Sequence, residues 1–245
     1  MKCRDTATSI LMALVVLFAT PAAQGVGSDQ AIQSEIAQRL AYRCLPGVFV
    51  TVDSGRVTLK GNVQSAWERK QAYEEARQVS GVRAVTSELT VITGQSDLEI
   101  AHQVKRQVAR YAFYTTFDSV EADVKNGTVL LSGWVLDSSR SRALVELAAR
   151  VHGVVEVKNL VRTLPLSPKD DEIRYEIAGR IYDDPLFRVY MDLLPVPIHI
   201  IVEHGQVTLT GIVESEVHRR LAEEIACRVS GVVRVENKLQ TRRLT

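Results

Sequence analysis

The chain has 245 residues, a formal net charge of +1, 46% hydrophobic residues and 24% charged residues. This composition is ordinary for a globular protein, and the length suits two or three small domains. Because the near-zero net charge provides no field that attracts nucleic acid, the composition argues against DNA or RNA as the main partner.

The first 25 residues have the layout of a targeting segment. Lys2 and Arg4 precede an apolar run over residues 10–19, and small residues follow over residues 21–25. The run is too short to span a bilayer comfortably. The order therefore predicts a secretory signal peptide over residues 1–25, cleaved between Ala22 and Gly25. An uncleaved N-terminal anchor is the alternative.

Two cysteines, Cys44 and Cys227, remain after this segment. An exported chain permits a disulfide between them. Two separate thiols are the favoured interpretation. Neither cysteine has a counterpart in the repeats described next, since Arg77 and Ala149 occupy the positions equivalent to Cys227.

A glycine-bounded motif, Gly-x-Val-x-Leu-x-Gly, occurs three times, over residues 55–61, 127–133 and 205–211. Each copy is followed, 20 positions after its second glycine, by Gly-Val-x-x-Val. A period of roughly 70–80 residues is too long for a solenoid and indicates a small domain repeated in tandem. We expect structural roles for the repeat glycines Gly55, Gly61, Gly81, Gly127, Gly133, Gly153, Gly205, Gly211 and Gly231.

Each repeat opens with an amphipathic helix. A Ser or Asp, as in Ser28-Asp29, Ser96-Asp97 and Asp170-Asp171, precedes apolar residues at every fourth position, which predicts an N-cap and a buried helix face. Alternating apolar residues then predict two strands joined by a tight turn, such as Asn126-Gly127. A second helix, ending at a glycine C-cap, leads to a closing strand.

These elements predict an α+β fold of three tandem domains over residues 28–93, 96–165 and 169–242. Each domain is helix-strand-strand-helix-strand, with two helices on one face of a three-stranded sheet. Linkers fall near residues 93–96 and 164–168, and two prolines make the second linker the stiffer one.

The repeats resemble the BON domain. The resemblance rests on the Asp-led helix, the Gly-x-Val-x-Leu-x-Gly hairpin and the closing Gly-Val-x-x-Val followed by Asn159 or Asn237, and it covers nearly all of the chain after residue 28. Domain 1 departs from the pattern, with Ser87 in place of the asparagine. The resemblance implies a periplasmic envelope protein, associated with phospholipid binding and osmotic stress.

The sequence contains no recognisable catalytic constellation. The histidines His102, His152, His199, His204 and His218 are scattered, and we expect each at the surface or at a helix end. The repeat glycines flank strands and are followed by no Lys-Ser or Lys-Thr, so they do not form a phosphate loop. We therefore expect no enzyme activity, no metal and no cofactor.

Two places combine an aromatic ring with cations, which is typical of a lipid headgroup layer. They give the candidate lipid-binding residues Trp67, Arg69, Lys70, Trp134, Arg140 and Arg142. The alternative is that each tryptophan packs in the core of its own domain.

Domain 3 carries a long segment, residues 182–197, with no counterpart in the other repeats. Its apolar residues Leu186, Phe187, Tyr190 and Met191 are candidates for binding a partner. The alternative is that the segment buries itself against its own domain.

The sequence thus predicts a non-catalytic exported protein, periplasmic and possibly bound peripherally to a membrane, that binds a phospholipid membrane surface. A periplasmic protein-protein interaction scaffold, using open sheet faces or the domain 3 segment, is the alternative. The sequence does not predict the oligomeric state.

Overall fold

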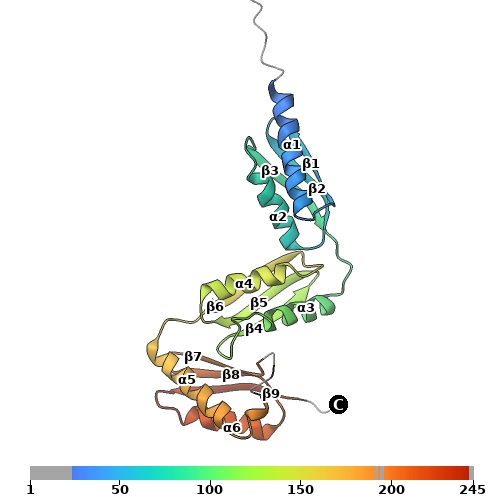
Figure 1. The fold of residues 1–245 in the computed structure, drawn as a ribbon. Coiled ribbons are helices and arrows are strands. Elements are labelled where there is room, and N and C mark those ends of the chain that lie inside the picture. Colours follow the sequence, from blue (N-terminus) through green and yellow to red (C-terminus); the bar gives the residue numbers. More distant parts are fainter. Residues whose placement is uncertain (1–23, 191–192, 194–195, 243–245) are drawn as a thin grey trace, which may run out of the picture.

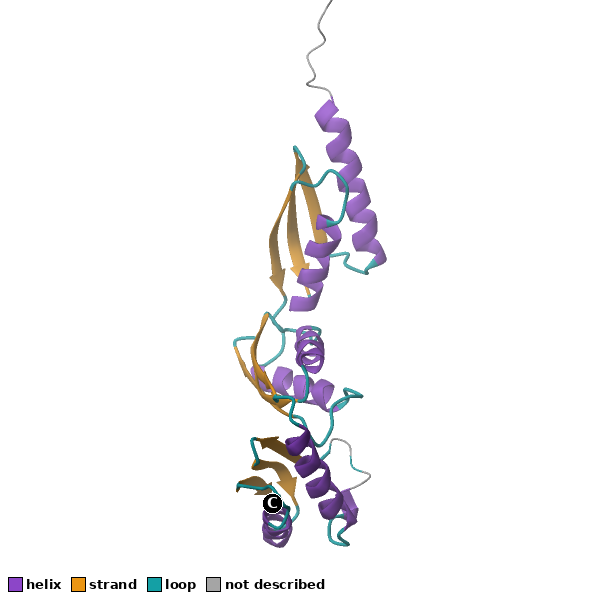
Figure 2. Cartoon of the chain, turned by 90° about the vertical axis from the view of Figure 1, so that its left-hand side faces the viewer, coloured by secondary structure: helices purple, strands orange, loops and turns teal. Residues whose placement is uncertain are grey.

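The computed structural model describes residues 24–190, 193 and 196–242 and places three small domains one after another (Figure 1 and Figure 2). The predicted signal peptide lies outside the described residues, apart from Gln24 and Gly25 at the start of the first helix. The three domains share one order of elements, and domain 3 adds a short 3-10 helix.

Domain 1 consists of α1 (Gln24–Tyr42), β1 (Val48–Asp53), β2 (Arg56–Val63), α2 (Ala66–Arg77) and β3 (Ala84–Val91). Domain 2 consists of α3 (Asp97–Ala109), β4 (Ser119–Lys125), β5 (Thr128–Val135), α4 (Ser138–Ala149) and β6 (Glu156–Thr163). Domain 3 consists of α5 (Pro168–Asp183), η1 (Arg188–Tyr190), β7 (Ile198–Glu203), β8 (Gln206–Val213), α6 (Glu216–Cys227) and β9 (Arg234–Thr241).

Each sheet has the second strand of its domain in the centre, paired antiparallel with the first strand and parallel with the third. Residues on the central strand alternate between a buried face under the two helices and an open face, as Val129, Leu131 and Val135 of β5 show. The predicted α+β fold with both helices on one sheet face is therefore confirmed.

The second glycine of each hairpin motif allows a close approach between strands. Gly61, Gly133 and Gly211 have φ angles of 119°, 123° and 120°. A Cβ atom at these positions would lie 2.0–2.1 Å from a carbonyl oxygen at the start of the neighbouring strand. Both the dihedral angle and the contact require glycine here.

The aspartates at the start of the first helices do not act as N-caps, so the predicted N-cap is confirmed only in α3, by Ser96, and is wrong in α1 and α5. Ser96 and Ser167 cap α3 and α5, and α1 begins at Gln24, before Ser28. The carboxylates instead accept hydrogen bonds from two consecutive backbone N–H groups of the hairpin turn, at 2.7–2.9 Å. The three pairings are Asp29 with Ser54-Gly55, Asp97 with Asn126-Gly127, and Asp170 with His204-Gly205.

The glycines expected at the C-caps of the second helices lie three residues further on. Gln78, Arg150 and Arg228 are the C-cap residues. Gly81, Gly153 and Gly231 have φ angles of 83–89° in the loops that lead to the closing strands. They use the conformational freedom of glycine in a loop and not at a helix end.

Candidate functional site

The first candidate lipid-binding patch, Trp67-Arg69-Lys70, lies at the contact between domains 1 and 2. The guanidinium of Arg150, in domain 2, lies 4.5 Å from the centroid of the Trp67 ring. Arg69 donates a hydrogen bond to the carbonyl of Val155 at 2.7 Å. Of the three residues, only Lys70 has an exposed side chain.

Backbone hydrogen bonds complete this contact. The N–H of Ala66 donates to the carbonyl of Val154 at 2.7 Å, and the N–H of Gly153 donates to the carbonyl of Gln64 at 2.9 Å. The side chains of Gln64 and His152 also meet here. Two loops thus join domains 1 and 2 largely through their backbones.

The second candidate patch is divided by the fold. Trp134 lies on the open face of β5, where the guanidinium of Arg162 is 5.3 Å from its ring centroid. Arg142 is exposed. Arg140 is instead bound to Asp118, whose side chain is fully buried, at 2.6 Å, and to Asp137 at 2.9 Å.

Asp118 organises the loop between α3 and β4, which contacts domain 3. Besides Arg140, its carboxylate accepts hydrogen bonds from the N–H and hydroxyl of Thr115 and from the N–H of Leu136. The loop then pairs with the free edge of β7. The carbonyl of Thr116 accepts from the N–H of Ile200, and the Thr116 hydroxyl donates to the carbonyl of Ile198, both at 2.7 Å. Domain 2 thereby covers an otherwise open strand edge.

Two aromatic side chains of the domain 3 segment are buried, whereas many of its other described residues are exposed. Phe187 and Tyr190 belong to the core of domain 3, where both rings contact His218. The Tyr190 hydroxyl accepts a hydrogen bond from the N–H of Glu214 at 2.8 Å. Leu186 is exposed, and Met191 lies outside the described residues. As candidates for partner binding, Phe187 and Tyr190 are therefore inaccessible, because they fill the core.

Helix α3 and the loop after it present a basic surface that does not belong to either predicted lipid-binding patch. Residues 100–117 contain Lys105, Arg106 and Arg110 and no Asp or Glu. None of these three cations forms an ion pair within the described chain. By contrast, Arg39 and Arg43 of domain 1 and Arg174 and Arg180 of domain 3 are paired with carboxylates.

We name this surface the α3 stripe, with the residues Leu98, His102, Lys105, Arg106, Ala109, Arg110 and Phe113. Leu98, His102, Lys105 and Ala109 are spaced by three or four positions, so they follow one side of the helix, and Arg106 and Arg110 flank them. Leu98 is 68% exposed and Phe113 is 63% exposed. The stripe combines unpaired cations with exposed apolar side chains. The lack of acidic residues over 18 positions was the sequence signal that could have identified it.

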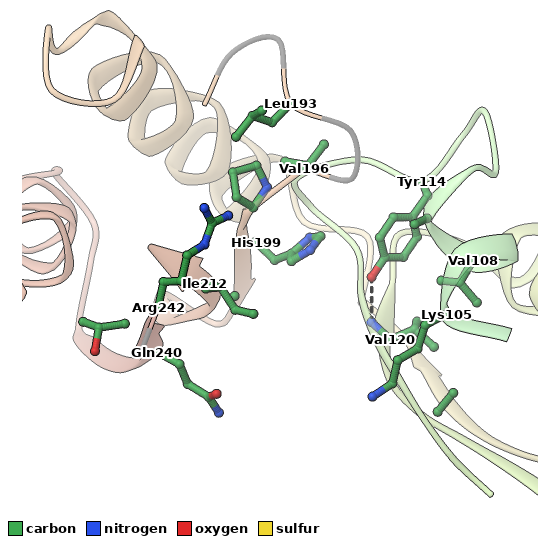
Figure 3. Close-up of a pocket in the computed structure, with 15 residues that line it drawn as sticks. Lys105, Val108, Tyr114, Val120, Leu193, Val196, His199, Ile212, Gln240 and Arg242 are labelled. Carbon is green, nitrogen blue, oxygen red and sulfur yellow. Dashed lines mark hydrogen bonds between the residues drawn. The ribbon is translucent and has the colours of Figure 1, made fainter. Parts of the chain in front are cut away.

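A groove of about 830 Å³ lies beside the stripe, between domains 2 and 3 (Figure 3). Lys105, Val108 and Tyr114 line the domain 2 side, and Ile212 and Arg242 line the domain 3 side. Like Lys105, Arg242 forms no ion pair within the described chain. The groove therefore has mainly apolar walls and one unpaired cation on each side.

His199 lines this groove, whereas the sequence predicted it at the surface or at a helix end. Its ring contacts the ring of Tyr114 with centroids 5.4 Å apart, and its Nδ1 atom has no hydrogen-bond partner among the described residues. Burial lowers the pKa of His199. Burial also raises the pKa of Tyr114 to about 12, so both groups are neutral at pH 7.

Within the described residues, no helix is long and apolar enough to cross a membrane, and no three His, Cys, Asp or Glu side chains are grouped as metal ligands. Cys44 and Cys227 are separate, exposed thiols in this structure, as the favoured interpretation predicted.

Comparisons with known proteins connect this architecture to a family. The sequence profile of the BON domain matches residues 28–93, 96–165 and 169–243. An uncharacterized protein in the gshII 5' region of Anaplasma centrale is 29% identical over 144 residues, which cover 55% of this chain and 93% of that protein.

Two solved structures of CdsD, described as a structural protein of the type III secretion system of Chlamydia trachomatis, were also matched. One, of the C-terminal domain, is 15% identical with a TM-score of 0.25 and covers 86% of this chain and 96% of that chain. The other is 14% identical with a TM-score of 0.25 and covers 85% and 91%. Since a TM-score this low supports no argument from these structures, the three profile matches and the threefold repeated fold decide the assignment. The chain belongs to the BON domain family and consists of three BON domains in tandem.

Proposed function

We propose that this protein is a non-catalytic, periplasmic envelope protein that binds anionic phospholipid surfaces through the α3 stripe of domain 2. The observation that carries the proposal is the set of three unpaired cations, Lys105, Arg106 and Arg110, in a stretch without any carboxylate. Membership of the BON family, whose members are associated with phospholipid binding, supports the choice of ligand.

The chemistry of the stripe matches that of a headgroup layer. Lysine and arginine side chains bind phosphate oxygens, and an exposed aromatic ring such as Phe113 is stable at the boundary between headgroups and acyl chains. Each cation near an anionic surface contributes about 1 kcal/mol, so the three cations contribute roughly 3 kcal/mol. Binding by the stripe alone is therefore modest and sensitive to salt.

The groove between domains 2 and 3 extends the same surface. Lys105 belongs to both the stripe and the groove, and Arg242 adds a further cation on the opposite side. The walls formed by Val108, Tyr114 and Ile212 offer an apolar place for part of an acyl chain once the stripe has docked.

Several residues that the sequence predicted to bind lipid contact other parts of the chain instead. Trp67 and Arg69 hold domains 1 and 2 together, and Arg140 neutralises buried Asp118. Lys70 and Arg142 are exposed, and we assign them a peripheral contribution to the attraction by anionic lipid. Trp134 remains a secondary candidate on the open sheet face.

Co-sedimentation with vesicles tests the proposal. We expect the protein to pellet with vesicles containing phosphatidylglycerol, to pellet less with pure phosphatidylcholine vesicles, and to be released as salt rises. Binding that is equal for both lipids and unchanged by salt would contradict the proposal. An absence of pelleting at low salt would also contradict it and would favour the protein-scaffold alternative.

A further inference from the structure

The contact between domains 1 and 2 has two halves that are short enough to compare across the repeats. We name residues 64–69 of domain 1, at the start of α2, the donor turn. We name Gly153-Val154-Val155 of domain 2, before β6, the acceptor loop. Two backbone hydrogen bonds and the Arg69 side chain connect them, and Val155 packs against the core of domain 1.

Domain 3 carries close equivalents of both halves. Its acceptor loop, Gly231-Val232-Val233, is the same tripeptide as in domain 2, and Arg228 stands at the position of Arg150. In its donor turn, residues 214–219, Val217 replaces Trp67 and Arg219 stands at the position of Arg69. The acceptor loop of domain 1 and the donor turn of domain 2 match less well. Domain 1 has Arg83 in place of the second valine, and domain 2 has Ser139 and Ser141 in place of Trp67 and Arg69.

Both equivalents are exposed in domain 3. Val233 is 77% exposed and Val217 is 62% exposed, whereas Val155 is partly buried by domain 1. The N–H groups of Gly231 and Glu216 and the carbonyl of Val232 have no hydrogen-bond partner in the described part of the chain. Their equivalents in domains 1 and 2 form the backbone hydrogen bonds of the contact.

We propose that domain 3 associates head to tail with domain 3 of a second copy, with the donor turn of one copy on the acceptor loop of the next. The side chains are complementary, because the contact between Gln64 and His152 is replaced by Glu214 and Ser230, a carboxylate acceptor and a hydroxyl donor. The Tyr190 hydroxyl holds the N–H of Glu214 and orders the donor turn.

Such a contact is heterologous, since two different surfaces meet, so a pair of copies retains one free donor turn, on one copy, and one free acceptor loop, on the other. The result is an open chain of copies, or a ring if the rotation closes. Within one molecule the linker gives the two halves of the contact a high effective concentration, which separate copies lack. We therefore expect a dissociation constant between copies that approaches the millimolar range. The α3 stripe lies on domain 2, so this inference does not depend on lipid binding.

Sedimentation velocity tests the proposal on the purified protein from about 10 μM to about 1 mM, a range set by the effective concentrations of short linkers. The weight-average mass should rise above that of a monomer. Val217→Asp and Val233→Asp each place a charge in the contact and should raise the protein concentration needed for association at least about tenfold. Leu160→Asp, at an exposed leucine of domain 2, is the matched control and should associate like the unmodified protein.

Mixing the two variants distinguishes a head-to-tail contact from a symmetric one. Val217→Asp retains its acceptor loop and Val233→Asp retains its donor turn, so an equal mixture should form dimers and nothing larger. Circular dichroism checks that both variants are folded, and Val217→Ser and Val233→Ser replace them if they are not. The proposal is overturned by a protein that stays monomeric at about 1 mM, by variants that associate normally, or by a mixture that stays monomeric or grows beyond the dimer.

Discussion

The carboxylate of Asp170 accepts a hydrogen bond from the backbone N–H of Gly205 at 2.9 Å, and this bond ties the start of α5 to the β7–β8 turn. His204 in the same turn has a positive φ angle of 52°, a conformation that costs free energy for a residue with a side chain. The aspartate stabilises this turn by satisfying its two consecutive N–H groups.

Asp170 gives the first prediction, a loss of stability in acid. Burial acts to raise the pKa of Asp170, but the hydrogen bonds from Gly205, His204 and Ser167 outweigh burial and lower it. A carboxyl whose pKa is lower in the folded state stabilises the fold above its unfolded pKa of about 3.9 and loses this contribution as pH falls further. Asp170→Asn should reduce the free energy of unfolding at pH 7 by about 1–3 kcal/mol and flatten its dependence on pH below about 4.

Chemical denaturation between neutral and acid pH measures this effect. The exposed Asp123, whose side chain forms no hydrogen bond within the described chain, provides the control Asp123→Asn. An equal loss of stability in both variants would show that the link between Asp170 and the turn is not responsible.

A pair of glycines in domain 3 gives the second prediction. A Cβ atom at Gly211 would lie 2.0 Å from the carbonyl oxygen of Pro197, at a φ angle of 120°, so Gly211→Ala should destabilise the protein by at least about 2 kcal/mol. Gly179, within α5, has no neighbouring atom within 4 Å of a Cβ, so Gly179→Ala should stabilise the protein by about 0.5–1 kcal/mol. Thermal unfolding measures both, and shifts of the same sign would contradict the structure.

Arg140 gives the third prediction, because it neutralises buried Asp118. Arg140→Ala leaves that carboxylate without its ion pair and should reduce the free energy of unfolding by roughly 2–4 kcal/mol. It should also loosen the loop around Thr116 and expose it to protease. Arg142→Ala, two residues away at an exposed position, should change neither property. Similar results for both variants would refute this role of Arg140.

Trp67 gives the fourth prediction, since its ring lies under the guanidinium of Arg150. Trp67→Ala removes a cation–π interaction of about 0.5–2 kcal/mol and should let domain 1 separate from domain 2. Small-angle X-ray scattering should then report a larger radius of gyration. Trp134→Ala, on the open face of domain 2, should leave the radius unchanged. A larger radius in Trp134→Ala than in Trp67→Ala would contradict the contact assigned to Trp67.

The fold was predictable because its determinants are local and repeated three times. The spacing of Gly133 and Gly153, and of the apolar residues between them, recurs in every domain, so the strands and helices could be placed from the sequence. The role of Asp97 was not predictable, because its hydrogen-bond partner Gly127 lies 30 residues away and a Ser-Asp pair beside a helix start is typical of an N-cap.

The candidate sites were less predictable, because they depend on contacts between domains. Trp67 and Arg69 have the local pattern of a lipid-facing pair, but Arg69 binds the carbonyl of Val155, 86 residues away. Conversely, Lys105 resembles a cation on any solvated helix. Its difference from Arg39 becomes visible only when the structure shows which cations have carboxylate partners.

Charge reversal on α3 tests the central claim most directly. The variant Lys105→Glu, Arg106→Glu, Arg110→Glu should lose most of its binding to phosphatidylglycerol vesicles at low salt, since it removes roughly 3 kcal/mol of attraction and adds repulsion. The control Arg77→Glu, Lys158→Glu, Arg234→Glu changes the net charge equally at exposed cations elsewhere and should retain most of the binding. Loss in the first variant alone is the result we predict. Equal binding by both variants, or equal loss in both, would show that the α3 stripe is not the lipid-binding surface.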